Sequence, residues 1–572
     1  MIKEIESLIA SGRYFEAHTL AINYCEEHPD DLRALQLCGL AMSKSGARTA
    51  AINFLEPVLE KNSEDVETAG ILGGVYKDHF KKTAESDFAR KSHETYLSNF
   101  EKTRSYYTGI NAATMSQILG RGIAAREVAK EVVEIASKDD NFWAYATVGE
   151  AYLLLKDPMK ALEYYKKAAE VGEGQFGMMG SVYAQLIILK HYIVVPERVI
   201  SLFSPPKIAV FAGHMIDNNR AEERFPEYIS EDIKDEIKKT LINNNIRIGF
   251  SSLACGSDIL FVEALIELGG EVNIYVPFNR KDFLKASVSF AGEHWLNRFE
   301  KIEKDHKIIY LTQSTYEGVD LFFQFLGQVM IGAGIMRASL FHDKPFLLTV
   351  ASENDQQNKP GGTKSVRSIW PYEQSILSIN SDEFLSKTTD TKVEDLEPFQ
   401  EKFAYSRLEQ NKLIQFFVFA TLINPDLEDK NEAIKEVGKK IREEFIEFPG
   451  QRRSGVTRKE VFGLYSRPHY AMDFALRLLE WTRQAGLEVR IALEAVLMTK
   501  GADPIKVIES TSNLKSLAFS DACYATMQFA AALSAEQPAR YDFHHVGEIQ
   551  IGNTDEGQEI YKIDQKVETA LG

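Results

Sequence analysis

The stretch that most constrains the fold runs from residue 246 to 276 and reads IRIGFSSLACGSDILFVEALIELGGEVNIYV. A short apolar run is followed by a loop of small residues, by apolar residues at helical spacing, by a Gly-Gly stop and by a second apolar run. This order predicts strand, tight loop, helix and strand, which is a βαβ crossover. The loop lies at a helix N-terminus, where free backbone N–H groups and the helix dipole favour an anion such as a phosphate. We therefore expect a ligand site at this loop.

Other runs of the middle third extend the pattern. Residues 207–211 (KIAVF), 307–311 (KIIYL) and 345–350 (PFLLTV) are typical of buried strands, and a helix is expected over about 229–243. Strands that alternate with helices predict a parallel, doubly wound sheet. Ligands of such sheets bind beyond the carboxyl ends of the strands.

Three loops are expected to meet at that edge of the sheet. They are the residues after 211, the loop 252–258 and the loop 359–363. Glycine lets the backbone approach a phosphate closely, and a threonine hydroxyl adds a donor. The candidate ligand-binding residues are Gly213, His214, Ser252, Ala254, Gly256, Asp258, Gly361, Gly362 and Thr363.

Each candidate also has a purely structural interpretation. The glycines at 256 and 361–362 are typical turn residues, and Asp258 suits a helix N-cap better than an acid–base role. His214 is compatible with ordinary polar surface. Glu263, in the helix that follows, is either a catalytic candidate or a solvated carboxylate.

Two separated motifs stand out in this region: SLACGSD at 252–258, followed by Glu263, and PGGT at 360–363. Together they resemble the SLOG superfamily, which includes the DNA-processing protein DprA, the cytokinin-activating LOG phosphoribohydrolases and nucleotide sensors. The resemblance implies a Rossmann-like domain that binds a nucleotide or a nucleotide-derived messenger, with both motifs holding phosphate or ribose. The hydrolase branch has the longer motif PGGxGTxxE. Here Lys364-Ser365-Val366-Arg367 follow instead, without the Glu, which weakens the case for cleavage of a glycosidic bond.

The first third of the chain carries an internal repeat and few strand signals. Three small residues recur 34 positions later: Gly12 as Gly46, Ala17 as Ala51 and Gly39 as Gly73. A period of 34, with small residues where paired helices touch, is typical of tetratricopeptide repeats. A further unit has the expected residue types at Trp143, Gly149, Tyr152, Ala161, Tyr164 and Ala168.

The stretch from Tyr106 to Ala168 resembles the helical-repeat region of the apoptosis signal-regulating kinases, which is often labelled a TRAF-binding region. The resemblance implies a protein-binding or interdomain scaffold. Its aromatic side chains are expected to form mainly the core of the repeats. Stacked helix pairs leave a concave groove, and the sequence does not name its occupant.

The last third predicts an α+β sandwich. Strands are expected over 413–423, 460–465 and 487–497, with helices over 431–445, 470–485 and 505–518. The runs that carry a resemblance to the class III nucleotidyl cyclase domain are FAT at 419–421, VFGLY at 461–465, RIALE at 490–494, VGEI at 546–549 and IYKI at 560–563.

The chemistry of such a cyclase is missing from these residues. The resemblance implies two carboxylates that hold paired metal ions, but Thr421 stands at the first position and Arg458-Lys459-Glu460 at the second. The Asn and Arg that position the triphosphate lack clear counterparts in 509–514. We expect a pseudocyclase used for dimerisation or binding. The basic loop that contains Arg458 and Lys459 is more consistent with a solvated surface than with an anion-binding site.

Composition limits the class of protein. A net charge of −17 argues against a nucleic-acid-binding surface. Four widely spaced cysteines without a CxxC pair predict reduced thiols, no zinc site and no other certain cofactor. The apolar run 414–423 is too short to span a bilayer, and the N-terminus reads as an amphipathic helix. We expect a cytoplasmic protein.

The sequence therefore predicts a repeat domain over 1–200, a SLOG-like domain over 205–380, a linker over 381–405 and a degenerate cyclase-like domain over 406–572. The first hypothesis is a non-catalytic bacterial-type signalling protein. It senses a nucleotide-type ligand, binds a protein through the repeats and forms a homodimer or larger oligomer. The alternatives are a nucleotide N-glycosidase or NAD-consuming enzyme and a pure interaction scaffold.

Overall fold

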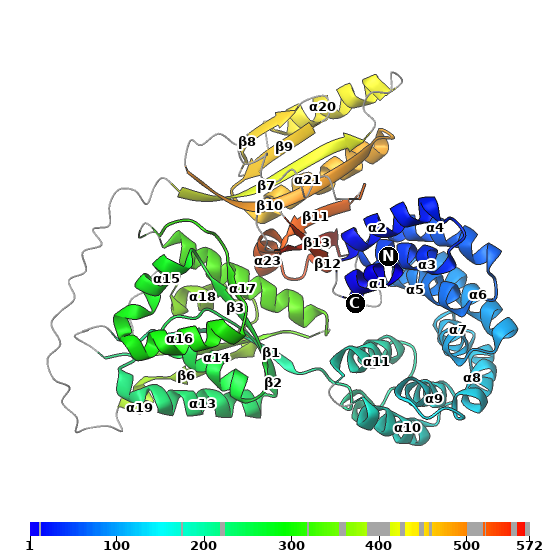
Figure 1. The fold of residues 1–572 in the computed structure, drawn as a ribbon, viewed down its shortest axis with the longest axis horizontal. Helices are drawn as coiled ribbons and strands as arrows, with labels where there is room; N and C mark the ends of the chain where they lie inside the picture. Colours follow the sequence, from blue (N-terminus) through cyan, green and yellow to red (C-terminus); the bar gives the residue numbers. More distant parts are fainter. Residues whose placement is uncertain are drawn as a thin grey trace. The chain divides into compact units, whose positions relative to one another are not determined.

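The computed structural model describes residues 1–10, 13–172, 175–217, 223–316, 318, 320–341, 343–353, 362–385, 412–423, 430–445, 451–456, 460–499, 519–520, 522–550 and 557–566. The chain divides into two compact units, one built on Met1–Pro205 and the other on Pro206–Phe543. Within Met1–Pro205 the described elements are all helices. The second unit contains a parallel α/β sheet followed by a mixed α+β sheet, as the sequence predicts (Figure 1).

The first unit is an array of tetratricopeptide-type helical hairpins. Its helices are α1 (Ile2–Ala10), α2 (Tyr14–Glu27), α3 (Leu32–Lys44), α4 (Arg48–Lys61), α5 (Val66–Thr83), α6 (Ser86–Thr103), α7 (Tyr106–Ile118), α8 (Gly122–Ala136), α9 (Phe142–Leu154), α10 (Pro158–Val171), α11 (Phe176–Lys190) and α12 (Glu197–Ile200). Several of these helices begin with a side chain that accepts a backbone N–H three residues on; such caps are Asp31, Asp65, Asn141 and Asp157.

The repeat glycines lie where paired helices touch. A Cβ on Gly73 would lie 2.6 Å from the ring of Tyr96, and one on Gly149 would lie 2.9 Å from the ring of Tyr165. These close approaches explain why the predicted repeat has small residues at these positions. Trp143 differs from the expectation of a core aromatic, because 49% of it is exposed. The preceding Phe142 takes the buried position at the start of α9.

The parallel sheet has six strands in the order β4-β3-β2-β1-β5-β6. They are β1 (Lys207–Gly213), β2 (Ile246–Ser251), β3 (Glu271–Val276), β4 (Ile308–Tyr310), β5 (Phe346–Ala351) and β6 (Ile376–Asn380), and every pair is parallel. The chain moves from β1 towards β4 and then returns to the other side of β1. The topological switch point therefore lies between β1 and β5.

Helices cover both faces of this sheet. One face packs against α13 (Ser230–Asn243), α14 (Ser257–Glu267), α15 (Arg280–Ser287) and α16 (Glu293–Asp305). The other packs against α17 (Leu321–Ser339) and α18 (Thr363–Ser368). The predicted doubly wound sheet is confirmed.

Helix α17 has no counterpart in the sequence prediction. By length and apolarity it could cross a membrane, yet 72% of its 18-residue apolar window is buried inside the protein. Gly334 on one side approaches Val210 of β1, and Gly332 on another side approaches Ala531 of the mixed-sheet domain. Contacts on both sides account for its apolar composition.

The mixed sheet has seven strands in the order β12-β13-β11-β10-β7-β9-β8. They are β7 (Lys412–Ile423), β8 (Gln451–Val456), β9 (Glu460–Tyr465), β10 (Glu488–Thr499), β11 (Ala522–Thr526), β12 (Tyr541–Gln550) and β13 (Gly557–Gln565). The helices α20 (Asn431–Phe445), α21 (Pro468–Gln484) and α23 (Met527–Glu536) pack on one side. The helix predicted over 505–518 lies outside the described residues, as does residue 386 onward of the predicted linker.

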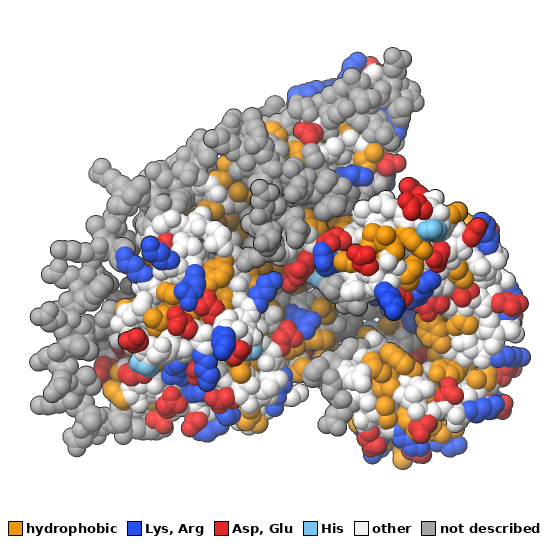
Figure 2. Space-filling view, viewed as in Figure 1, with side chains coloured by type: hydrophobic (Ala, Val, Ile, Leu, Met, Phe, Trp, Pro, Cys, Tyr) orange, Lys and Arg blue, Asp and Glu red, His pale blue; other side chains and the backbone are white. Residues whose placement is uncertain are grey.

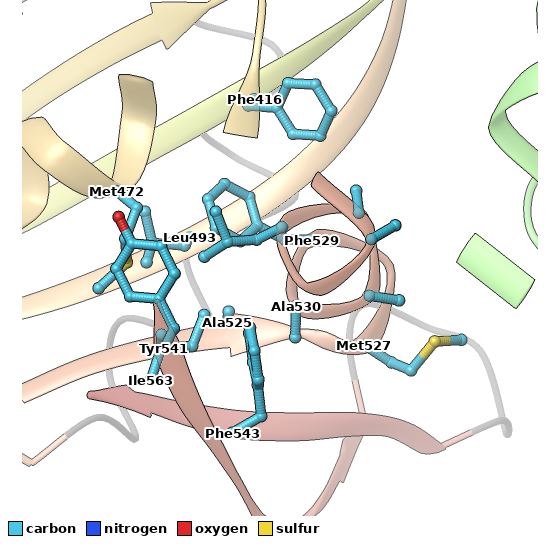
Figure 3. Close-up of a cluster of buried hydrophobic side chains, with 14 of the residues drawn as sticks. Phe416, Met472, Leu493, Ala525, Met527, Phe529, Ala530, Tyr541, Phe543 and Ile563 are labelled. Carbon is cyan, nitrogen blue, oxygen red and sulfur yellow. The ribbon is translucent and has the colours of Figure 1, made fainter. Parts of the chain in front are cut away.

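The core of the mixed-sheet domain continues into the parallel-sheet domain. Figure 3 shows Leu493 of β10 and Phe529 of α23 gathered with Met472 and Tyr541. The same hydrophobic cluster also contains Val329 of α17 and residues of β1 and β2. The two sheets therefore share one buried core across α17 and α23.

Candidate functional site

The carboxyl ends of the parallel strands place the predicted residue Gly213 at one edge of the sheet, together with residues outside the predicted set. Gly213 ends β1, Ser251 ends β2 and Asn380 ends β6, and parallel strands place these ends together. The residues after β1 and β5 flank the switch point, where ligands of this type of sheet bind. Gly361 lies outside the described residues.

The loop after β2 is built directly against the loop after β1. Gly256 has φ +96°, and a Cβ there would lie 2.7 Å from the backbone N of Ile216 and 2.9 Å from the backbone O of His214. Ser257 donates its backbone N–H to His214 O at 3.1 Å and its hydroxyl to the same oxygen at 2.7 Å. A Cβ on Gly213 would also meet the Ser257 side chain. The glycines at 213 and 256 thus allow two parts of the chain to approach closely.

Asp258 holds this loop through backbone hydrogen bonds. Its carboxylate accepts the backbone N–H groups of Ala254, at 3.4 Å, and of Gly213. Burial raises the pKa of Asp258 to about 7, although both backbone hydrogen bonds oppose the shift. The side chain keeps partial contact with solvent. Asp258 is therefore a carboxyl group at the sheet edge that titrates near neutral pH.

The neighbouring candidates Ser252 and Ala254 are buried, and Cys255 donates its backbone N–H to Ser287 O at 2.8 Å. Burial raises the pKa of the Cys255 thiol well above its usual range, so the thiol is protonated at neutral pH. Hydrogen bonds to His214 O and Ser287 O tie this loop to neighbouring segments. A ligand role for its residues stays a prediction.

The second glycine motif reaches the same edge from the other face of the sheet. Gly362 precedes α18, and Thr363 is its first residue, with 9% of the residue exposed. Val366 of α18 packs into the core on the α17 side, whereas α14 packs on the opposite side. The motifs at 256 and 362 therefore flank the edge from the two faces.

Two serine hydroxyls at this edge are absent from the predicted set of site residues. Ser251 is 1% exposed and ends β2, and Ser381 directly follows β6 and is fully buried. Within the part of the chain that the structure describes, neither hydroxyl has a hydrogen-bond partner. Leaving a buried hydroxyl unpaired costs about 1–3 kcal/mol. The sequence feature that could have indicated these hydroxyls is a serine at or just after the end of an apolar strand.

Glu263 lies two turns into α14 and contacts two neighbouring helices. Its carboxylate accepts two hydrogen bonds from Arg298 of α16, at 2.9 and 2.6 Å, and lies 3.0 Å from Lys234 Nζ of α13. Burial alone would raise the pKa of Glu263, but the bonds and charges of Arg298 and Lys234 lower it. These contacts give Glu263 a structural role that the sequence did not reveal.

Replacing Glu263 by Gln removes the carboxylate that Arg298 and Lys234 share, while Lys234 keeps its ion pair with Glu267 at 2.7 Å. All three side chains are under 20% exposed, so we expect the free energy of unfolding to fall by about 1–3 kcal/mol at pH 7. Because the folded-state pKa is lowered, this stabilisation is present above the unfolded pKa and is lost as pH falls through the folded one. Urea denaturation at pH 7 and pH 3 measures both effects. Glu231→Gln, on a 76% exposed side chain 3.7 Å from Arg298, is the control and should change little.

The contribution of Asp258 to the free energy of unfolding depends on pH in the opposite sense to that of Glu263. Its folded pKa is raised to about 7, so between about pH 4 and pH 7 the unfolded chain ionises while the folded chain keeps the proton. The folded state loses relative stability over this range. Asp258→Asn keeps an acceptor oxygen, and its stability relative to the wild type should rise by about 1–3 kcal/mol between pH 4 and pH 8. A constant difference across these pH values would contradict the raised pKa.

The mixed sheet places Thr421 of β7 opposite Glu460 of β9 on one side and Arg490 of β10 on the other. Arg458 and Lys459 lie outside the described residues, as do 509–514.

Charged side chains of both signs lie on the face of the molecule that Figure 2 draws. On the face seen in Figure 2, acidic and basic side chains are interspersed over the helical repeats and over the parallel-sheet region.

A protein-family model described as Tetratricopeptide Repeats-Sensor matches residues 16–116. This stretch runs from α2 into α7 and supports the helical repeats. No match to the chain was found among curated proteins.

Solved structures match separate parts of the chain. The thermophilic TPR protein TTC0263 of Thermus thermophilus is 18% identical, with 32% of this chain and 97% of that chain covered and a TM-score of 0.28. MamA protein is 18% identical, with 30% and 88% covered and a TM-score of 0.23. Adenylate cyclases from Trypanosoma brucei are 12% identical, with 28% and 90% covered and a TM-score of 0.22. At these scores the fold assignment rests on the strand order and helix pairing described above.

Proposed function

We propose that this protein is a non-catalytic signalling protein whose parallel-sheet domain senses a nucleotide or nucleotide-derived ligand. The helical repeats bind a protein partner, and the cyclase-like domain serves dimerisation or binding. The observation that carries the proposal is the pair of buried, unpartnered hydroxyls, Ser251 and Ser381, at the carboxyl edge of a switch-point sheet. The family description that matches residues 16–116 supports a sensory role.

The ligand chemistry follows from the groups at the edge. Serine and threonine hydroxyls both donate and accept, which suits ribose hydroxyls and phosphate oxygens. Thr363 and Gly362 approach from one face, and the Gly213–Gly256 contact stands on the other. The resemblance of these two motifs to the SLOG superfamily favours a nucleotide-type molecule over other anions.

Isothermal titration with a panel of nucleotides tests the proposal, with Ser251→Ala as the decisive variant. Removing an unpaired buried hydroxyl should leave stability within about 1 kcal/mol, because no protein hydrogen bond is lost. If the hydroxyl binds the ligand, affinity should fall about 10-fold, which corresponds to about 1.4 kcal/mol.

The matched control is Ser534→Ala, which removes another fully buried, unpartnered hydroxyl, on α23. It should leave nucleotide affinity unchanged. Absence of binding by the wild type at high micromolar nucleotide, or equal affinity in Ser251→Ala and wild type, would reject the sensory site.

A second candidate, a nucleotide N-glycosidase or NAD-consuming enzyme, is favoured by Asp258. A carboxyl group with a pKa of about 7 at a ligand edge suits general acid–base chemistry at neutral pH. Release of free base from labelled nucleotide or NAD, abolished by Asp258→Asn and retained by Glu263→Gln, would favour the enzyme. Binding without turnover favours the sensor.

The proposed pseudocyclase role concerns how copies of this chain assemble. Thr421 stands at the first position and Arg458-Lys459-Glu460 at the second position where the cyclase resemblance implies metal-binding carboxylates, so binding or dimerisation replaces cyclisation in this proposal. Sedimentation of the full chain over a range of concentrations tests dimerisation. The proposed TRAF-binding-like role of the repeats and a cytoplasmic location complete the scheme.

A further inference from the structure

An aromatic stack stands at the carboxyl edge of the parallel sheet, beside the proposed ligand site. Phe278 lies two residues after the end of β3, and Tyr316 belongs to the loop that follows β4. Their rings are nearly parallel, with centroids 4.5 Å apart and an interplanar angle of 9°. Phe278 is fully buried, whereas Tyr316 is partly exposed. The stack therefore places a flat aromatic ring at the sheet edge, supported from behind by a core side chain.

Two further rings pack beside this stack. The centroid of Phe323 lies 5.6 Å from that of Phe278 and 5.7 Å from that of Tyr316, with interplanar angles of 82° and 80°. The centroid of Phe322 lies 5.6 Å from that of Phe278 and 6.4 Å from that of Tyr316. A ring placed over the second face of Tyr316 would lie much farther from Phe278 than from Tyr316. Both rings therefore flank the stack, and neither covers the face of Tyr316 that points away from Phe278.

Hydrogen bonds fix the loop that carries Tyr316. Asn279 donates its side-chain amide N–H to Ser314 O at 2.8 Å, and Asp282 Oδ2 accepts the backbone N–H of Tyr316 at 2.9 Å. Both partners belong to the N-terminal end of α15, where Asn279 also accepts the backbone N–H of Asp282 at 3.0 Å. The loop is thus preorganised, and a ligand that contacts Tyr316 has little ordering of the chain to offset.

The stack lies next to Ser251, the hydroxyl on which the sensory proposal depends. Strand β3 pairs directly with β2, with Ile274 opposite Ser251, and adjacent strands lie about 4.8 Å apart. Phe278 also belongs to the same hydrophobic cluster as Leu253 and Cys255, which follow Ser251. A molecule bound at Ser251 therefore needs to extend only across one neighbouring strand to reach the stack.

We propose that Tyr316 is the base platform of the ligand site: the sugar phosphate of a nucleotide binds at Ser251, and its base stacks on the face of Tyr316 opposite Phe278. Aromatic side chains stack on any nucleic-acid base, because every base has a π-face, and one such stack raises affinity about 10-fold or more. The assignment rests on the proposed sensory function and deepens it, because it specifies a ligand that carries an aromatic base.

Isothermal titration of the full-length chain with base-containing and base-free probes tests the platform. The probes are the monophosphates of adenosine, guanosine, cytidine and uridine, and ribose 5-phosphate, which lacks the base. We expect the wild type to bind at least one nucleotide about 10-fold more tightly than ribose 5-phosphate. Tyr316→Leu should lose this preference and keep the wild-type affinity for ribose 5-phosphate. Tyr316→Phe, which retains the ring, should bind as the wild type does.

Two matched variants complete the test. Ser251→Ala should weaken nucleotide and ribose 5-phosphate binding to a similar degree, because it removes a group that does not contact the base. Tyr372 is also partly exposed and lies edge-on to an aromatic ring, with its centroid 5.9 Å from that of Trp370. It precedes β6 and so stands at the amino end of the sheet, away from the site. Tyr372→Leu should leave the affinity for all probes unchanged.

The outcomes separate the platform from the sensory function. Equal affinity of the wild type for nucleotides and ribose 5-phosphate would overturn the platform alone, and so would an unchanged preference for nucleotides in Tyr316→Leu. Binding of none of the probes would overturn the sensory function and the platform with it. Because the comparison of probes is made on the wild type, it decides the proposal even where Tyr316→Leu fails to fold.

Discussion

Replacing Gly332 by alanine is expected to lower the free energy of unfolding by about 3 kcal/mol or more, because α17 and α23 touch through their backbones at this point. A Cβ on Gly332 would lie 2.8 Å from Ala531 Cα and closer still to the Ala531 carbonyl group. Backbone atoms cannot rotate away as a side chain can. The helices must therefore separate, or the variant must lose the contact.

A matched control is present on the same helix. A Cβ on Gly327 would lie 3.2 Å from a methyl group of Val366, which can shift by a few tenths of an ångström. Gly327→Ala has the same gain in helix propensity, about 0.5–1 kcal/mol, without the backbone clash. Urea denaturation of both variants isolates the effect of the helix contact. If the two variants differ by less than about 0.5 kcal/mol, the close approach of α17 and α23 is wrong.

The Gly332 contact also concerns how the two sheets unfold. Val329 of α17 and Phe529 of α23 belong to one hydrophobic cluster, and Gln328 donates to Ala532 O at 3.2 Å. A shared core of this kind makes the two sheets unfold in one cooperative transition. In Gly332→Ala we expect two separated transitions or one broadened transition, measured by circular dichroism together with tryptophan fluorescence.

The sequence is a good guide to those elements whose signals are local. The Gly-Gly stop at 269–270 ends α14, and Gly269 has φ +68°, the left-handed conformation that terminates a helix. The crossover from β2 through α14 to β3 follows from spacing within 31 residues of sequence. The tetratricopeptide period likewise has a local cause at Gly39 and Gly73, 34 residues apart, each of which meets a side chain of the neighbouring helix.

The elements that escaped prediction depend on distant parts of the chain. Helix α17 is apolar on all sides because it packs against β1 and β2 on one side and α23 on another. It therefore lacks the one-sided periodicity by which a surface helix is recognised. Glu263 reads as a catalytic or solvated residue in isolation, and only the fold brings Arg298 and Lys234 to it.

The candidate site likewise contains features that local sequence predicts and features that depend on distant parts of the chain. Two strands and two glycine turns at the sheet edge could be predicted from alternating elements and loop composition. The unpaired hydroxyl of Ser381 could not, because its burial depends on strands and helices from outside its own stretch of chain. The hydrogen bonds that tie the 254–258 loop to the rest of the fold were also hidden, since their acceptors include His214 and Ser287.

Gly256→Ala is the second substitution for which we expect a large loss, about 3 kcal/mol in the free energy of unfolding. Gly256 has φ +96° and ψ −135°, a conformation that residues with a Cβ rarely adopt. The added methyl group would also meet backbone atoms of three consecutive residues, His214, Met215 and Ile216. Backbone strain at residue 256 and the steric clash of the added methyl group both lower the stability of Gly256→Ala.

The control for Gly256 is Gly269→Ala, at the other end of the same helix. Gly269 also has a positive φ, but a Cβ there meets nothing within 4 Å. Gly269→Ala should lower the free energy of unfolding by about 1 kcal/mol through backbone strain alone. Thermal and urea denaturation of the two variants separate strain from contact.

This comparison decides how any ligand experiment at Gly256 is interpreted. Because the glycine is required by the approach of residues 214–216, its replacement destroys the edge of the sheet whether or not a ligand binds there. Loss of nucleotide binding in a Gly256 variant would therefore follow from unfolding of the loop. Ser251→Ala avoids this ambiguity, since it removes a hydroxyl that no described residue uses. If Gly256→Ala instead keeps wild-type stability, the contact between the two loops is wrong, and the sheet edge must be more open than the structure shows.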